Sequence, residues 1–190
     1  MTDALKNYVK AFDDVLSPEQ CRKFIELFES CPAVHVEFSR QRCPNFVQAE
    51  LKALVSTSGA FTDAQEQMLA GLKGLLAKYC RELPVRQFQF PDRFAVEAVR
   101  VKKYRVGVGD AFDLHTDVSD HASARRFLAF LIYLNDVEEG GETIFPDIGI
   151  RMSPKAGSAL VFPPLWMWRH EGCTPLSGPK YIASSYLHYL

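Results

Sequence analysis

The second half of the chain is a series of short runs rich in aromatic and β-branched residues, each interrupted by Gly, Pro, Asn or Asp. Runs of this kind are typical of β-strands separated by tight turns. Because such strands need a second layer to bury their apolar faces, we expect a β-sandwich or jelly roll. The expected strands lie near residues 94–104, 126–134, 142–146, 158–162 and 180–188.

Two amphipathic helices are expected in the first half. Ser17, Pro18 and Gln20 form the pattern of a capping box with proline at the first helical position, and Pro32 follows the expected end. A second capping box is expected at Thr62, followed by an apolar stripe: Met68, Leu69, Leu72, Leu75, Leu76, Tyr79 and Leu83.

These elements predict a single domain over residues 1–190, because 190 residues can bury a full core and no linker is evident. Helical support is expected over about 17–83, and a mainly β, jelly-roll core over about 94–190. Residues 33–60 are harder to interpret and are expected to form a strand and a loop.

The composition, with 47% apolar and 24% charged residues, is that of an ordinary globular protein. The net charge of −1 gives no reason to expect nucleic acid or an anionic membrane as a partner. The longest apolar run, residues 127–134, is too short to span a bilayer, and residues 1–10 lack the apolar core of a signal peptide. The five cysteines show no C-x-x-C spacing. We therefore expect a cytoplasmic protein with reduced thiols.

His115 and Asp117 are candidate metal ligands. Alternation along a strand would point both side chains to one face and Thr116 to the other. Two imidazoles and one carboxylate suit non-haem Fe(II), because they leave positions open for a bidentate 2-oxo acid and O₂. The spacing alone is a weak signal, since roughly 0.3 such pairs are expected by chance in a chain of this composition. A solvated loop histidine is the alternative.

His170 is the best candidate for the third ligand, because it follows an apolar strand and the aromatic pair Trp166 and Trp168. Both tryptophans are expected to pack in the core or at its rim, with substrate contact as the alternative. The remaining histidines are expected to be surface or packing residues: His35, His121 and His188.

Lys180 lies ten residues after His170, at the start of an expected strand. A lysine that faces inward there is placed to pair with the far carboxylate of a dicarboxylic co-substrate, and the pairing offsets the cost of burying both charges. A solvated charge at the strand end is the alternative.

Several longer stretches resemble the prolyl 4-hydroxylase group of the 2-oxoglutarate/Fe(II)-dependent dioxygenase superfamily. They are residues 130–146, 154–162 and 170–180, and residues 12–21 resemble the entry helix of the same group. The resemblance runs from about residue 10 to the C-terminus, with residues 33–92 largely unmatched. It implies a double-stranded β-helix, or jelly roll, buttressed by N-terminal helices, with the iron at one open end.

The resemblance also implies the roles of particular residues. His115, Asp117 and His170 match the metal ligands, and Lys180 matches the residue that binds the C5 carboxylate of 2-oxoglutarate. The other matches line the co-substrate pocket (Tyr133, Tyr104 and, more weakly, Thr143) or face the substrate in some members (Arg126). Trp168 is added as a candidate substrate contact. The implied cofactors are Fe(II), 2-oxoglutarate as co-substrate and O₂, with ascorbate as an accessory reductant.

The expected function is therefore hydroxylation of a C–H bond, in a peptide or protein residue such as proline. The same chemistry on a free amino acid or small metabolite is the first alternative, and a non-catalytic metal-binding jelly roll is the second. Lys180 beside an intact triad argues against the second alternative. Tyr186 stands where tryptophan is common in the group, and the stretch from Tyr104 to His115 is longer, so the substrate entrance is expected to differ.

Overall fold

Two antiparallel β-sheets face each other in the computed structural model, which describes residues 2–39, 44–59, 63–83 and 89–190. The larger sheet has the order β1 (Lys10–Phe12), β10 (Ala159–Phe162), β7 (Arg126–Tyr133), β12 (Lys180–Tyr189), β5 (Arg100–Tyr104), β3 (Phe46–Glu50) and β2 (Val36–Phe38), and β4 (Phe94–Val96) also pairs with β12. The smaller sheet has the order β6 (Phe112–His115), β11 (His170–Gly172), β8 (Thr143–Phe145) and β9 (Ile150–Met152). The expected mainly β jelly-roll core is confirmed.

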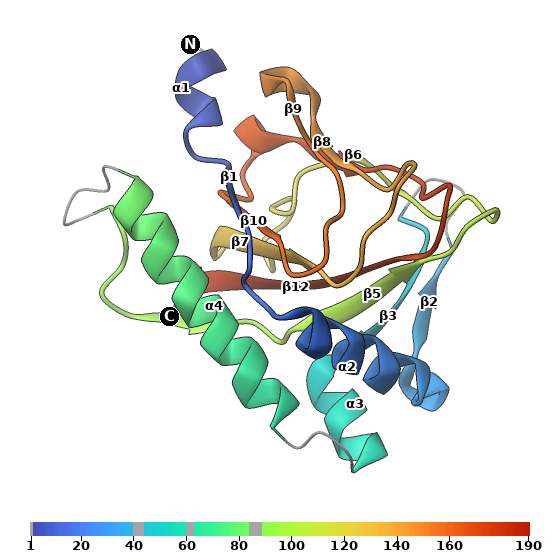
Figure 1. Cartoon of the computed structure of the whole chain (residues 1–190). Helices are drawn as coiled ribbons and strands as arrows, with labels where there is room; N and C mark the ends of the chain where they lie inside the picture. Colours follow the sequence, from blue (N-terminus) through green and yellow to red (C-terminus); the bar gives the residue numbers. More distant parts are fainter. Residues whose placement is uncertain (1, 40–43, 60–62, 84–88) are drawn as a thin grey trace.

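Three helices lie on the side of the larger sheet that faces away from the smaller one (Figure 1). They are α2 (Pro18–Glu29), α3 (Leu51–Ser58) and α4 (Ala64–Glu82), and a short α1 (Thr2–Lys6) precedes β1. The one-turn 3₁₀ helices are η1 (Pro32–Val34), η2 (Pro146–Ile148) and η3 (Trp166–Trp168). Within the described ranges, no helix has the length and apolar character needed to cross a membrane.

The N-terminus of α2 has the predicted capping box. Ser17 Oγ accepts a hydrogen bond of 3.2 Å from the backbone N–H of Gln20, and Gln20 Oε1 accepts one of 2.9 Å from the backbone N–H of Ser17. The N-cap of α4 is Asp63, whose side chain makes no capping bond, and the capping box predicted there depends on Thr62. Thr62 lies outside the described residues. The predicted apolar stripe of α4 does pack against the sheet.

Two predicted segments differ in detail. The strand expected over 94–104 is split into β4 and β5, although both pair with β12. Val96 pairs with Leu187 and Arg100 with Ser184, so the β4–β5 side carries one residue more than the β12 side, and Glu97 lies in this bulge. Residues 33–60 contain η1, β2, β3 and the unpredicted helix α3, and residues 40–43 lie outside the described ranges.

The strand β12 separates two hydrophobic cores. Its side chains alternate, so Tyr181, Ala183 and Leu187 pack under the helices, whereas Ile182 packs between the sheets. Lys180, Ser184 and Tyr186 share the inward face with Ile182 and line a cavity. The alternation thus brings polar side chains into the space between the two sheets.

A candidate metal and co-substrate site between the sheets

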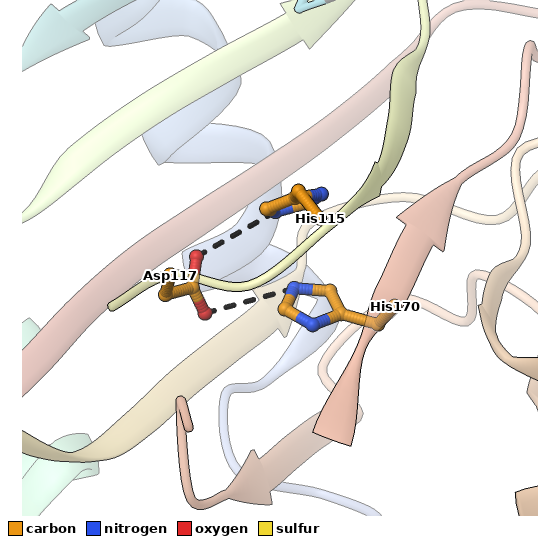
Figure 2. A group of neighbouring side chains, drawn as sticks. All are labelled: His115, Asp117 and His170. Carbon is orange, nitrogen blue, oxygen red and sulfur yellow. Dashed lines mark ion pairs between the residues drawn. The ribbon is translucent and has the colours of Figure 1, made fainter. Parts of the chain in front are cut away.

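Three side chains, two from neighbouring strands and one from the turn that follows the first strand, converge on one point (Figure 2). His115 is the last residue of β6 and His170 the first of β11, and the antiparallel register pairs them directly. Directly opposed residues in such a pair bring their side chains together, and the two ring centroids are 4.3 Å apart. One potential ligand atom from each of His115, Asp117 and His170 lies within 4.8 Å of the others.

Asp117 does not continue the strand, contrary to the predicted alternation. β6 ends at His115, and Asp117 reaches the same point from the turn that follows. Two hydrogen bonds hold this turn: Thr116 Oγ1 donates to the carbonyl of Val118 at 3.1 Å, and Arg126 Nη1 donates to the carbonyl of Asp117 at 3.1 Å. The turn therefore places the Asp117 carboxylate beside the two histidines, without a continuation of the strand.

Backbone carbonyls orient both imidazoles. Nδ1 of His115 lies 2.7 Å from the carbonyl oxygen of Asp113, and Nδ1 of His170 lies 3.1 Å from that of Trp168. A carbonyl oxygen can only accept, so each Nδ1 carries a proton, and Nε2 of each ring is the atom available to a metal ion. The two Nε2 atoms lie 3.6 Å from Oδ1 and Oδ2 of Asp117, respectively.

The charges of the triad suit a divalent cation. Burial alone would raise the pKa of Asp117, but the two imidazoles and a hydrogen bond from Tyr186 hold it well below its usual value. Burial lowers the pKa of His170, which favours its neutral imidazole. One carboxylate oxygen and two imidazole nitrogens are a donor set that fits Fe(II).

Tyr186 and Arg126 surround the carboxylate of Asp117. The Tyr186 hydroxyl donates to Oδ1 of Asp117 at 2.7 Å, and burial beside this negative charge raises the pKa of Tyr186 well above its usual value. The Arg126 guanidinium lies 4.0 Å from the centroid of the Tyr186 ring and makes two hydrogen bonds to Glu97, of 2.7 and 2.9 Å. Arg126 therefore lies behind the triad and does not line its cavity.

Lys180 lies at the other end of the same cavity. Its side chain is 1% exposed, and its Nζ donates to the carbonyl of Gly141 at 2.9 Å and lies 4.3 Å from the Tyr104 ring centroid. Burial lowers the pKa of Lys180 to about 8. Within the described ranges, no carboxylate lies within ion-pair distance of this ammonium group.

Tyr133 and Thr143 form a buried pair near this end. The Tyr133 hydroxyl donates to Thr143 Oγ1 at 2.7 Å, and Thr143 lines the cavity. Tyr133 lies behind Thr143 and is not among the lining residues. The structure therefore brings Tyr104, Thr143 and Lys180 together at one end of the cavity, with the triad at the other.

The cavity is narrow, with a volume of about 40 Å³. Apolar side chains make up much of its wall: Phe112, Ala129, Phe130, Leu131, Phe162 and Ile182. Phe112 stacks on His115 with ring centroids 3.5 Å apart. These walls restrict the access of water to the triad.

Trp168 does not reach the cavity. Its Nε1 donates to the carbonyl of Leu5 at 3.1 Å, and its ring makes an edge contact with Tyr8 at 5.9 Å. These contacts give Trp168 the packing role expected for it, and it is not among the residues that line this cavity. His35 also packs, since its ring stacks on Phe28 at 4.0 Å.

Sequence reasoning missed several lining residues, among them Lys102, Phe112, Gly172 and Ser184. Two of them follow strand alternation, because Lys102 precedes the predicted Tyr104 by two positions and Ser184 follows the predicted Lys180 by four. Phe112 and Gly172 are paired across β6 and β11. That long-range pairing leaves no local signal.

Comparison with known proteins supports the assignment of a metal and co-substrate site. Residues 99–188 match the 2OG-Fe(II) oxygenase superfamily. Probable prolyl 4-hydroxylase 9 of Arabidopsis thaliana is 26% identical over 93% of this chain and 67% of its own length. The chain covers a far smaller share, 20–21%, of the animal prolyl 4-hydroxylase alpha subunits that it also matches.

Two solved structures share the fold. A viral collagen prolyl hydroxylase from Paramecium Bursaria Chlorella virus-1, in complex with 2-oxoglutarate, superposes with a TM-score of 0.72 at 21% identity, over 96% of this chain and 97% of that one. A prolyl hydroxylase from Trichoplax adhaerens, in complex with a peptide fragment of the hypoxia inducible factor oxygen degradation domain, superposes with a TM-score of 0.71 at 15% identity. The match covers 98% of this chain and 86% of that one.

The fold, the triad and these matches define the class of protein. The chain resembles the 2-oxoglutarate/Fe(II) oxygenase superfamily, which residues 99–188 match. Within that superfamily it resembles the prolyl hydroxylases.

Proposed function

We propose that this chain is a prolyl-4-hydroxylase-like enzyme that hydroxylates a proline residue in a peptide or protein. The observation that carries the proposal is that His115, Asp117, His170 and Lys180 all open into one cavity. The 2-oxoglutarate complex of the viral relative supports the proposed co-substrate. The peptide complex of the Trichoplax relative supports a peptide as substrate.

The proposed roles follow from the geometry. His115, Asp117 and His170 would hold Fe(II) through two Nε2 atoms and one carboxylate oxygen, and Lys180 would bind the C5 carboxylate of 2-oxoglutarate. Bound Fe(II) supplies redox chemistry in which O₂ oxidises 2-oxoglutarate to succinate and CO₂ and converts a substrate C–H to C–OH, with ascorbate as an accessory reductant. The protein's own contribution is to orient the two reactants and to exclude water.

Tyr186 would keep the metal-binding carboxylate in place. A hydrogen bond from Tyr186 to Oδ1 of Asp117 restricts rotation of the carboxylate, and Arg126 fixes the Tyr186 ring from behind. Partners of this kind orient metal ligands, and their loss typically costs about 10–100-fold in metal affinity. Arg126 is therefore proposed to act through Tyr186 and Asp117.

A polar groove beside the triad is the proposed path of the peptide. It shares Asp117 with the cavity and is otherwise lined by Glu97, Ser119, Asp120, Ala122, Ser123, Arg125, Arg126 and His188. Its hydroxyl, carboxylate and guanidinium groups suit the N–H and C=O groups of an extended chain. A residue of that chain beside Asp117 would lie next to the metal.

The other side of the entrance is an ordered loop. Arg105 makes hydrogen bonds of 2.8 and 3.1 Å to the Asp110 carboxylate and a 2.7 Å bond to Glu37. Asn45 and Ala111 exchange two backbone hydrogen bonds of 2.9 and 3.0 Å. These contacts hold residues 105–111 against β2 and β3, so this edge of the entrance is fixed before substrate arrives.

We keep a cytoplasmic location as a prediction. Cys21, Cys31, Cys80 and Cys173 are free thiols, which suits a reducing compartment. Cys43 lies outside the described residues. Neither nucleic acid nor a membrane is proposed as a partner, because the chain has a net charge of −1 and no basic block.

The proposal is tested by incubating the protein with Fe(II), 2-oxoglutarate, ascorbate and a library of proline-containing peptides in air. Mass spectrometry should find one added oxygen atom on a proline, and none with His170→Ala. Oxidation of free amino acids with no peptide product would instead identify a small-metabolite oxygenase. Neither binding nor decarboxylation of 2-oxoglutarate would indicate a non-catalytic binding protein.

A further inference from the structure

A second lysine, Lys102, lies inside the cavity and has no role in the site described above. It belongs to β5 and faces inward, two positions before Tyr104. The residue is only 9% exposed, and its Nζ lies 5.0 Å from the ring centroid of Phe46 and 5.8 Å from that of Phe112. Its ammonium group is thus held between aromatic rings in the wall of the cavity.

The protein does not neutralise this charge directly. In the part of the chain that the structure describes, no carboxylate lies within ion-pair distance of Lys102. Burial lowers the pKa of Lys102 to about 8, and Asp117 is the negative group that opposes this shift. Asp117 is also the only carboxylate of the candidate metal site, so a bound metal ion would compete for its charge. An ammonium ion buried without a partner is costly, and aromatic faces compensate only in part.

The charges in the cavity therefore favour an anion. Lys102, Lys180 and a divalent metal ion together bring four positive charges, and Asp117 brings one negative charge. A dianionic 2-oxo acid would still leave the cavity with a net positive charge. Lys102 would thus strengthen the attraction for every carboxylate that enters.

The strand register places Lys102 between the two ends of the cavity. Lys180 pairs with Tyr104, whereas Lys102 pairs with Ile182, which is the next inward residue of β12. Further along that face comes Tyr186, whose hydroxyl contacts Asp117. A 2-oxo acid that spans the distance from the triad to Lys180 must therefore pass Lys102.

We propose that Lys102 binds a carboxylate of the 2-oxo acid, so that two lysines hold the co-substrate. The inference rests on the proposed function, since it adds a residue to the same site. Lys180 binds the end of the acid far from the metal, and Lys102 contacts it from the β5 side. The expected consequence is a loss of co-substrate affinity when the charge at Lys102 is removed.

The test measures binding by calorimetry without O₂, using the full chain loaded with Mn(II). The ligands are 2-oxoglutarate and 2-oxovalerate, which keeps the C1 carboxylate and the keto group but lacks the C5 carboxylate. Lys102→Met removes the charge with little change in volume, and Lys102→Gln is a second variant should the first fail to fold. The matched control is Lys103→Met, because Lys103 is the neighbouring residue on the outward face and pairs with Glu29 at 2.9 Å.

We expect Lys102→Met to raise the Kd of 2-oxoglutarate about 10-fold or more, with Mn(II) affinity unchanged and Lys103→Met like wild type. An equal loss for 2-oxovalerate would place the C1 carboxylate at Lys102, and a loss for 2-oxoglutarate alone would place the C5 carboxylate there. A wild-type Kd for 2-oxoglutarate in a folded Lys102 variant overturns the inference. Lys180→Met separates the two claims: if it too leaves the Kd unchanged, the co-substrate assignment itself is wrong.

Discussion

The hydroxyl of Tyr186 donates a 2.7 Å hydrogen bond to Oδ1 of Asp117, the one carboxylate of the triad. The two residues come from different sheets, since Tyr186 lies in β12 of the larger sheet and Asp117 follows β6 of the smaller sheet. Asp117 Oδ2 lies nearer to His170, at 3.6 Å from Nε2. The two carboxylate oxygens therefore differ in their hydrogen bonding, because Oδ1 accepts the hydrogen bond from Tyr186 and Oδ2 does not.

Replacing Tyr186 with Phe should weaken metal binding. The variant leaves the carboxylate of Asp117 freer to rotate, and the loss of such a partner typically costs about 10–100-fold in affinity. Mn(II) titration followed by electron paramagnetic resonance measures the effect. The control is Tyr181→Phe, which removes a hydroxyl on the opposite face of β12 that donates to Glu29 at 2.8 Å. Equal affinities for the two variants would contradict the positioning role of Tyr186.

Replacing Lys180 with Met should affect the co-substrate far more than the metal. The side chain is buried, and its partners in the structure are the carbonyl groups of Gly141 and Cys173. Loss of a buried charge-assisted hydrogen bond costs about 1.5–3 kcal/mol, which corresponds to roughly 10–150-fold in Kd. Calorimetry with 2-oxoglutarate and with Mn(II) separates the two effects, and equal losses would refute the assignment.

The affinity for 2-oxoglutarate should fall as the pH rises through about 8, the pKa to which burial lowers Lys180. The protonated lysine binds the carboxylate and the neutral amine does not. Above pH 8, each further pH unit therefore lowers the fraction of protein with protonated Lys180, and with it the affinity, about 10-fold. This fall continues up to the pKa that Lys180 has in the complex. Charge on Cys173 and Glu142 favours the protonated lysine, whereas Lys102 opposes it. Binding measured on either side of pH 8 should show this fall, and a Kd independent of pH would exclude it.

Trp168→Phe should lower stability and leave the active site intact. The variant loses the 3.1 Å hydrogen bond from Nε1 to the carbonyl of Leu5, a change worth about 1–2 kcal/mol of unfolding free energy. Denaturant unfolding measures the loss, and 2-oxoglutarate binding serves as the control. A wild-type unfolding free energy combined with loss of peptide turnover would restore Trp168 as a substrate contact.

Local patterns in the sequence were sufficient where a structure depends on neighbours along the chain. The capping box at Ser17 predicted the start of α2, and the apolar runs predicted β7, β10 and β12 within one or two residues. By contrast, β6 and β11 have four and three residues, and they are strands because they pair with each other. No local pattern marks so short a pair.

The candidate site, like the fold, combines features that the sequence predicts with features that depend on long-range pairing. The resemblance predicted the residues that converge, but the register that pairs His115 with His170 is a long-range property of the fold. For Trp168 the sequence left packing and, as the alternative, substrate contact open, and contacts with Leu5 and Tyr8, distant in the chain, give it the packing role. Lys102 was missed because a lysine is ordinarily solvated, although its place two positions before Tyr104 puts it on the inward face of β5.

The central claim is that His115, Asp117 and His170 form one ferrous site that turns over 2-oxoglutarate. It is tested most directly by release of labelled CO₂ from 2-oxoglutarate with Fe(II), in the wild type, His170→Ala and His121→Ala, where His121 lies exposed in a turn. We predict release by the wild type and by His121→Ala, and none by His170→Ala. Release at the wild-type rate by a folded His170→Ala protein would contradict the account.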